Sequence, residues 1–188
     1  MRGPPSRILL KLSGEAFHGP EGPVSRKALD RVATEILPLK SVELAIVVGG
    51  GNILRGARAT GFDRIEADTL GMLATVLNAL ALHSRLDGEG RHVIVQSAVY
   101  TEQTDPISVR KAKTALADGT IVLFAGGTGS PLVTTDTAAA LRAVSIEADL
   151  LAKASNVAGV YDHDPATSQE AVLLPEISYT EFIEKRYG

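Results

Sequence analysis

Apolar and polar residues follow two different spacings along this chain, one typical of buried strands and one typical of amphipathic helices. Runs such as RILLKL and ELAIVV are short and rich in leucine and β-branched residues, which indicates strands that are apolar on both faces. The segments between such runs repeat apolar residues every three or four positions, as helices do. The pattern predicts strands at 7–12, 43–48, 92–97, 120–125 and 149–154, and helices at 25–37, 63–86, 105–119, 135–147 and 179–188.

Local signals predict where several of these helices begin and end. Ser25 is the expected N-cap of the first helix, which Pro38 ends. Asp105 is expected to cap the third helix, with Pro106 at its first position and Gly119 at its end.

The alternation of strands and helices predicts the fold class. Strands that are apolar on both faces and separated by helices indicate a mostly parallel sheet covered on both sides, a three-layer α/β/α sandwich with right-handed crossovers. With 188 residues and no obvious linker, residues 1–188 are expected to form one compact domain.

Composition narrows the possible partners and compartment. The chain is 45% hydrophobic and 22% charged, and its net charge of -3 gives no broad electrostatic footprint for nucleic acid. It has no cysteine, so neither a disulfide framework nor a thiolate metal site is indicated. The apolar run near the N-terminus is too short for a signal peptide, and no segment is expected to reach the length of a membrane span. We therefore expect a cytoplasmic protein with no membrane partner.

Three glycine-bearing segments directly follow predicted strands: KLSG at 11–14, GGGN at 49–52 and AGGTGSP at 125–131. In open parallel sheets, ligands bind at the carboxyl ends of the strands, where these three segments would meet. Backbone amides freed by glycine, together with the start of a following helix, suit phosphate oxygens. A glycine triplet also suits a tight turn, a positive φ angle or a bare backbone beside a ligand. Phosphate is the leading ligand.

Charged residues in these loops indicate phosphoryl transfer. Lys11 and Arg55 could reach the oxygens of one transferring phosphoryl group, whose transition state is stabilised by positioned cations. Either residue alone would more often be a solvated surface cation. Asp136 suits both a site role and the N-terminal turn of a helix, and the two are compatible.

Other phosphate and metal motifs are absent from the sequence. It contains no GxxxxGK[ST], and neither GGGNIL nor GTGSPL completes GxGxxG, which excludes a P-loop enzyme and disfavours a dinucleotide fold. The four histidines show no metal-ligand spacing, and none falls in a glycine loop. They are His18, His83, His92 and His163.

Five segments, in this order and at these separations, resemble the UMP kinase branch of the amino acid kinase family. They are ILLKLSGEAF, AIVVGGGNILRGA, ADTLGMLATVLNALAL, FAGGTGSPLVTTDTAAALRA and KASNVAGVYDHDP, and they cover essentially the whole chain. ADTLGMLATVLNALAL and TTDTAAALRA are specific to that branch, whereas KLSG and GGG occur more widely. The resemblance implies ATP-dependent phosphorylation of UMP to UDP in pyrimidine nucleotide biosynthesis. It also implies Mg²⁺ bound with ATP, a homohexamer, and nucleotide effectors such as GTP and UTP.

The resemblance further implies roles for particular residues, with the acceptor site mainly before residue 120 and the ATP site mainly in 120–188. The catalytic residues would be Lys11, Arg55 and Asp136, with no protein metal ligand. ATP would contact Lys11, Ser13, Gly14, Gly51, Arg55, Ser155, Tyr161 and Asp164. UMP would contact Gly50, Asp68, Thr128, Gly129, Ser130, Pro131, Leu132, Val133, Thr134 and Thr135. Without the resemblance, Asp68 is better read as a helix charge and Tyr161 as a packed aromatic residue.

The chain departs from the family pattern in three places. TGSPLVTTD stands where the family usually has TGNPFFTTD, so Ser130, Leu132 and Val133 put base selection or acceptor affinity in question. KASNVAGV stands where KATKVDGV is common, which places Asn156 and Ala158 near the nucleotide and predicts weaker ATP binding. The family continues past position 188 with an MD-x-x-A motif, so the C-terminal part of the fold is expected to be missing from this chain.

Two alternative functions remain open at the level of sequence. A sister kinase acting on carbamate, glutamate or acetylglutamate would share KLSG and GGG, but we would not expect it to contain ADTLGMLATV. A truncated, non-catalytic protein would bind nucleotides without turnover.

Overall fold

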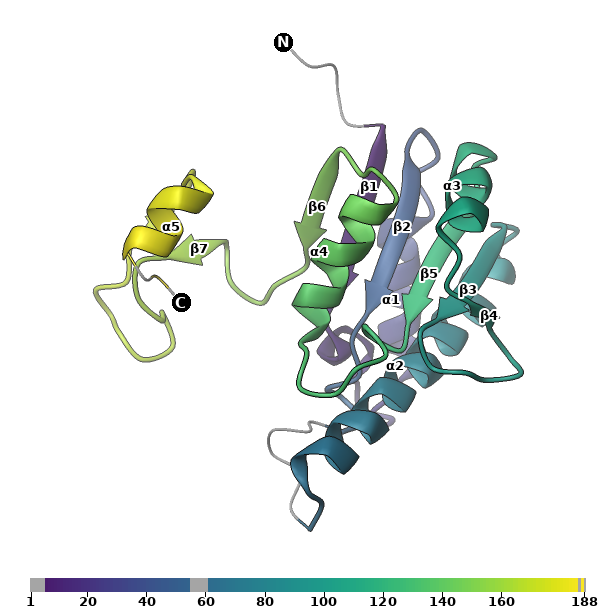
Figure 1. Cartoon of the computed structure of the whole chain (residues 1–188), viewed down its shortest axis with the longest axis horizontal. Coiled ribbons are helices and arrows are strands. Elements are labelled where there is room, and N and C mark those ends of the chain that lie inside the picture. The colour runs from purple at the N-terminus through teal and green to yellow at the C-terminus, as the bar shows by residue number, and fades with distance from the viewer. Residues whose placement is uncertain (1–5, 55–60, 186, 188) are drawn as a thin grey trace. The chain divides into compact units, whose positions relative to one another are not determined.

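The computed structural model describes residues 6–54, 61–185 and 187, and the chain divides into two compact units (Figure 1). The first unit is Met1–Ala154 and the second is Ser155–Gly188. The expected single domain over 1–188 concerns both units together and stays a prediction.

Six parallel strands form the central sheet of the first unit. They are β1 Arg7–Leu12, β2 Glu43–Val48, β3 Val93–Ser97, β4 Asp105–Pro106, β5 Ile121–Ala125 and β6 Leu150–Lys153. Their order is β4-β3-β5-β2-β1-β6, so β1 lies between β2 and β6. Because all the neighbouring strands are parallel, their carboxyl ends meet at one edge of the sheet.

Helices cover both faces of this sheet, as the sequence predicted (Figure 1). The helices α1 Arg26–Ile36 and α2 Arg64–Asp87 pack on one face, and α3 Val109–Ala117 and α4 Thr135–Ser145 pack on the other. Fully buried side chains fill both layers, for example Ile46 on the first face and Leu116 on the second. Burying one such side chain contributes about 1.5–3 kcal/mol, so the two cores fix the sheet on which the loops are mounted.

The starts of α1 and α2 agree with the predicted helix ranges 25–37 and 63–86, and Ser25 is the predicted N-cap of α1. The Ser25 hydroxyl accepts a hydrogen bond from the Ala28 amide at the start of α1. At the start of α2, Asp63 accepts from the amides of Ile65 and Glu66, and the Glu66 carboxylate accepts from the Asp63 amide. This capping box satisfies amide groups that a helix start otherwise leaves without partners.

The predicted start of α3 is wrong. Asp105 and Pro106 form the edge strand β4, in which Pro106 pairs with Ser97 of β3, and Ser108 is the N-cap of α3. Proline lacks an amide hydrogen, so it is tolerated on an edge strand as well as at a helix start. The end of α3 near Gly119 agrees with the prediction.

The expectation that no segment reaches the length of a membrane span does not hold for α2. Its 24 residues are long and apolar enough, by length and composition alone, to cross a membrane. However, Val76, Ala79 and Leu82 are buried in the core that α2 forms with the sheet. This packing accounts for the buried apolar side chains of α2.

The remaining elements are short. A 3₁₀ helix, η1 Gly14–Phe17, follows β1 in the first unit. In the second unit, β7 Val160–Tyr161 pairs antiparallel with β8 Leu173–Leu174, and α5 Tyr179–Lys185 is the expected last helix.

Candidate active site

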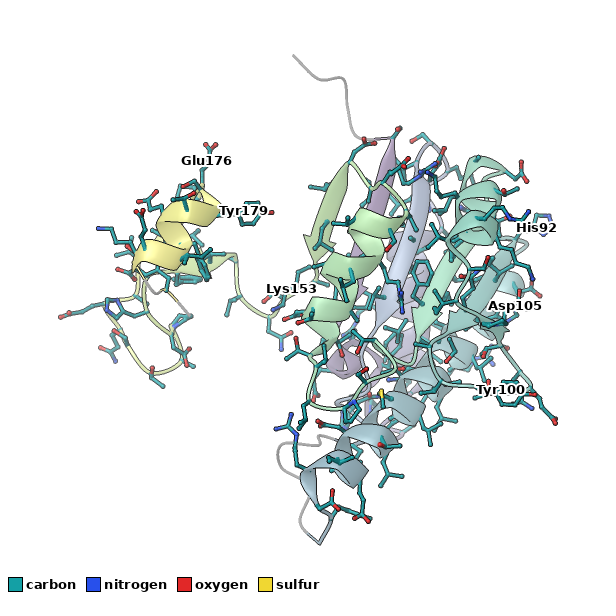
Figure 2. All side chains as sticks on the ribbon, in the orientation of Figure 1. His92, Tyr100, Asp105, Lys153, Glu176 and Tyr179 are labelled. Carbon is teal, nitrogen blue, oxygen red and sulfur yellow. The ribbon has the colours of Figure 1, made fainter. Side chains whose placement is uncertain are left out.

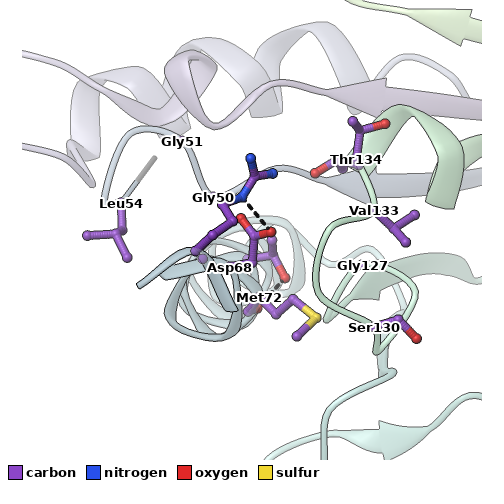
Figure 3. A pocket seen from close by; sticks show the side chains of 13 residues that line it. Gly50, Gly51, Leu54, Asp68, Met72, Gly127, Ser130, Val133 and Thr134 are labelled. Carbon is purple, nitrogen blue, oxygen red and sulfur yellow. Dashed lines mark hydrogen bonds and ion pairs between the residues drawn. The ribbon is translucent and has the colours of Figure 1, made fainter. Parts of the chain in front are cut away.

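A pocket of about 480 Å³ lies between the loops that follow β2 and β5 and the first half of α2 (Figure 3). In Figure 3 the β5 loop, with Gly127, Ser130 and Thr134, lies opposite Asp68 and Met72 of α2. The volume is within the range of small-molecule sites in proteins. The lining residues are Gly50, Gly51, Leu54, Arg64, Asp68, Gly71, Met72, Thr75, Gly127, Ser130, Val133, Thr134 and Thr135.

The triple-glycine loop is tightly packed against its neighbours. A Cβ atom on Gly50 would lie 2.6 Å from the Gly71 carbonyl oxygen of α2, and one on Gly49 would lie 2.9 Å from the Gly14 amide nitrogen. Neither Gly49 nor Gly50 has a positive φ angle. Glycine is therefore required here by close backbone approach, which leaves Gly50 and Gly51 free to line the pocket on their open side.

The loop after β5 uses glycine differently. Gly126, Gly127 and Gly129 have φ angles of 74°, 57° and 82°, in the left-handed region that glycine adopts without steric cost. Leu132 also has a positive φ, 65°, which costs about 1–3 kcal/mol for such a residue. Hydrogen bonds from the Leu132 amide to the Asp68 carboxylate and from the Ser130 amide to the Thr128 hydroxyl hold the loop in this conformation.

The structure brings many of the expected UMP-binding residues together. Six of them line the pocket: Gly50, Asp68, Ser130, Val133, Thr134 and Thr135. Gly51, which was expected on the ATP side, lines it too. Thr128, Gly129, Pro131 and Leu132 belong to the same loop but are not among the lining residues. The α2 residues Arg64, Met72 and Thr75 also line the pocket and were not predicted.

Asp68, in the first half of α2, is held by two hydrogen bonds. One carboxylate oxygen accepts from the Arg64 guanidinium and from the Leu132 amide, each at 2.8 Å. Burial by itself would raise the pKa of Asp68, but the Leu132 amide and Arg64 outweigh it and bring that pKa below its ordinary value. Asp68 is therefore an ionised acceptor that links α2 to the β5 loop.

A second polar cluster lies at the end of β1. Asp136, in the first turn of α4, contacts the Lys11 ammonium at 2.9 Å through one oxygen and the Lys153 ammonium at 2.8 Å through the other. Lys11 is largely buried, whereas Lys153 and Asp136 are about half exposed. Burial alone would raise the pKa of Asp136, but hydrogen bonds from Lys153 and Lys11 outweigh it, so that pKa is lowered. The cluster has a net positive charge next to the glycine loops.

Lys153 is the member of this cluster that sequence reasoning missed. It ends β6, as labelled in Figure 2, and it is the cross-strand partner of Lys11, so both side chains leave the same face of the sheet. Two lysines at the ends of predicted strands are the signal that could have found it, but it depends on β6 being the neighbour of β1.

Ser13 and Gly14 lie beside the triple-glycine loop. The Ser13 hydroxyl caps η1 by accepting from the Glu15 amide at 3.4 Å. A Cβ on Gly14 would lie 2.6 Å from the Gly51 amide nitrogen, so the loops after β1 and β2 are in contact.

The second unit contains a pocket of its own, about 310 Å³ in volume. Tyr161 and Asp164, both expected near the ATP nucleoside, line it together with His163 and Phe182. One Asp164 carboxylate oxygen accepts from the Ala166 amide at 2.9 Å.

Two expectations remain to be placed. Arg55 lies outside the residues that the structure describes. Within residues 6–54, 61–185 and 187, no group of three or more histidine and carboxylate side chains could hold a metal ion.

Comparison with known proteins identifies relatives of the whole chain. The sequence model of the Amino acid kinase family matches residues 6–188. The uridylate kinase of Methylococcus capsulatus is 48% identical over 186 residues, covering 96% of this chain and 78% of the relative. The uridylate kinase of Stutzerimonas stutzeri is 45% identical over 188 residues, covering 97% of this chain and 76% of the relative.

Solved structures agree with these relatives. The UMP kinase of Bacillus anthracis superimposes with a TM-score of 0.91 at 34% identity, covering 98% of this chain and 79% of that one. The UMP kinase of Ureaplasma parvum gives a TM-score of 0.89 at 32% identity, covering 99% of this chain and 81% of that one.

Proposed function

This chain belongs to the amino acid kinase family, and from that premise we propose that it transfers the γ-phosphoryl group of ATP to UMP. Support comes from the uridylate kinases that are 45–48% identical to it over most of their length. The observation that carries the proposal is Asp136, held between Lys11 and Lys153 at the same sheet edge as the glycine loops. The sister reactions on carbamate, glutamate or acetylglutamate are not favoured by these relatives.

The acceptor would occupy the 480 Å³ pocket. The Asp68 carboxylate would accept hydrogen bonds from the ribose hydroxyls, because an ionised carboxylate has about four acceptor sites and its two present partners use only part of them. The uracil ring and the phosphate would form hydrogen bonds with Ser130, Thr134 and the amides of the β5 loop. Gly50 would face the acceptor phosphate, and Gly51 the donor.

Lys11 would stabilise the transferring phosphoryl group, because the transition state spreads negative charge over its equatorial oxygens. Asp136 would orient Lys11, and its second contact, with Lys153, leaves a net positive charge for the phosphates of ATP. Arg55 would bridge toward the transferred group. Ser13 and Gly14 would contact the phosphates from the loop after β1.

No protein base is needed for this reaction. The nucleophile is a phosphate oxygen of UMP, and a phosphate monoester has its second pKa near 6, so UMP is mostly dianionic at neutral pH. Magnesium would enter as part of the substrate MgATP, with its charge placed on the phosphates. In the second unit, Ser155, Tyr161 and Asp164 would surround the ATP nucleoside.

We further propose that the protein works as a homo-oligomer, a hexamer by resemblance, with nucleotides such as GTP and UTP as effectors. The exposed side chains of Leu70, Leu73 and Leu77 support self-association, because they follow one another at helical spacing on α2.

The test is a coupled assay of phosphoryl transfer from ATP to a panel of nucleoside monophosphates, carbamate, glutamate and acetylglutamate. We expect turnover with UMP well above every other acceptor. Turnover confined to a carboxylate or carbamate would replace UMP by a sister substrate, and nucleotide binding without any turnover would make the chain a non-catalytic binder.

A further inference from the structure

Two polar residues of α2, Thr75 and Asn78, are buried in an otherwise apolar region. Asn78 is 0% exposed and Thr75 is 3% exposed, and both lie beside the core residues Val76 and Ala79. Burying an amide or a hydroxyl costs free energy unless it is hydrogen-bonded. The partners of these two side chains therefore indicate what they do.

Asn78 holds the triple-glycine loop. Its Nδ2 group donates to the Gly49 carbonyl at 2.7 Å and to Asn52 Oδ1 at 2.7 Å. Its Oδ1 atom accepts from Asn52 Nδ2 at 3.0 Å, and Asn52 Nδ2 also donates to the Pro23 carbonyl. The first and last residues of the loop 49–52 are thus fixed to one buried side chain.

Thr75 holds the other glycine loop. Its hydroxyl accepts a hydrogen bond from the Gly126 amide at 2.6 Å and donates to the Met72 carbonyl at 2.7 Å. Gly126 has a positive φ and begins the loop 126–131, which lines the pocket through Gly127 and Ser130.

Thr75 and Asn78 are three residues apart, so they lie on one face of α2, about one turn from each other. One rigid helix therefore holds both loops, and their separation is set by a single helical turn. Asn78 does not line the pocket, although Thr75 does. Asn78 consequently acts on a bound substrate only through the loop that it holds.

We propose that Asn78 and Thr75 are positioning residues that fix the loops 49–52 and 126–131 relative to each other, so that donor and acceptor phosphates meet in line. The inference rests on the proposed phosphoryl transfer. A displacement of about 1 Å between reacting groups can cost about 100-fold in rate, so loosening either loop lowers turnover more than it lowers substrate binding.

The kinetic test uses Asn78→Leu, with Leu82→Ala as a matched control. Leu82 is also fully buried on α2, but it packs in the core and holds neither loop. We expect Asn78→Leu to lower kcat about 10- to 100-fold per folded molecule, with KM for UMP and for ATP within about threefold of wild type. Leu82→Ala lowers the melting temperature but leaves kcat per folded molecule unchanged. A kcat for Asn78→Leu within about twofold of wild type would overturn the proposal.

The second loop offers a pair of variants that preserve the packing. Thr75→Val removes the hydroxyl at nearly constant shape, and Thr75→Ser keeps it. We expect amide hydrogen exchange at Gly126, measured by NMR, to be at least about tenfold faster in Thr75→Val and near wild type in Thr75→Ser. Activity should be lowered in Thr75→Val and stay closer to wild type in Thr75→Ser.

The exchange measurement needs no substrate, so it separates the two possible failures. If the wild type does not phosphorylate UMP but Thr75→Val still speeds exchange at Gly126, the proposed function is wrong, and Thr75 still holds the loop 126–131. If the wild type phosphorylates UMP and the Gly126 exchange rate is the same in Thr75→Val, Thr75→Ser and wild type, the proposed positioning role is wrong and the proposed function stands. Should Asn78→Leu not fold, the Thr75 pair decides the matter through the same exchange and rate measurements.

Discussion

The carboxylate of Asp136 lies 2.9 Å from the ammonium group of Lys11, which joins the first turn of α4 to the end of β1. The lysine side chain is a flexible four-carbon stem that ends in a charged ammonium group, so this contact restricts the ammonium group to one direction. The pair therefore positions a cation at the sheet edge before any nucleotide arrives.

Lys11→Met should abolish turnover while leaving UMP binding largely intact. The substitution keeps the apolar stem and removes the charge that would stabilise the transferring group. We expect kcat to fall by more than about 100-fold, with the UMP dissociation constant from calorimetry changed less than about threefold. Lys27→Met is the control, because Lys27 is 77% exposed and lies outside the cluster. A rate within about tenfold of wild type, or about 1.4 kcal/mol of barrier, would show that Lys11 is not catalytic.

Lys153→Met should affect the donor side of the reaction. Removing this lysine takes one positive charge from the cluster and frees one Asp136 oxygen. We expect kcat/KM for ATP to fall about tenfold, whereas KM for UMP stays within about twofold. Lys153→Arg keeps the charge and should recover most of the loss. Equal losses in Lys153→Met and Lys153→Arg would mean that the positive charge is not what matters at this position.

Asp68→Asn should weaken UMP far more than ATP. The amide loses acceptor capacity on the side that faces the pocket, and it weakens the contacts with Arg64 and the Leu132 amide. We expect KM for UMP to rise about tenfold and KM for ATP to rise less than about twofold. Asp87→Asn, at the exposed far end of α2, removes the same charge and should change neither. Equal losses for both nucleotides would assign Asp68 to general stability.

The pH dependence of turnover should follow UMP itself. At saturating MgATP, activity should rise with pH through the second ionisation of UMP, near pH 6, and the midpoint should stay in place when each histidine is replaced by glutamine. Because the pKa of Asp136 is lowered, its charge and any stability it contributes are present above the unfolded value, near 3.9, and are lost only as pH falls below that. Asp136→Asn should therefore lower the rate at every pH above 5 without moving the midpoint.

Two results would contradict this account of the pH profile. One is a midpoint that moves in any of the four variants at His18, His83, His92 and His163. The other is a midpoint that stays put when UMP is replaced by an analogue with a different phosphate pKa. Either would show that a group on the protein takes the proton.

The sequence predicted the sheet well because its signals are local. Runs such as 43–48 are apolar on both faces, and a serine or aspartate directly precedes the first turn of α1 and of α2. The start of the third helix was predicted wrongly for the same reason, because the prediction used local signals alone. Asp105 and Pro106 satisfy the rules for a helix start, but pairing with β3 places them on an edge strand.

Only those residues of the candidate site that directly follow a predicted strand could be predicted from the sequence. The glycine loops follow their own strands, so the residues after β2 and β5 were found. Lys153 and Thr75 were missed because their roles depend on which strand lies next to β1 and on how closely α2 approaches Gly126. These are properties of packing between distant segments, which periodicity does not specify.

The place of β6 beside β1 has a consequence for synthesis of the protein. Among the described strands of the sheet, β1 comes first in the sequence and pairs with β6, which comes last, and Lys153 is the final residue of β6. Contacts between segments so far apart in sequence form late, because the loop between them must close first. A nascent chain therefore contains both glycine loops before Lys153 can reach Asp136, and the charged centre is completed only after β6 has emerged.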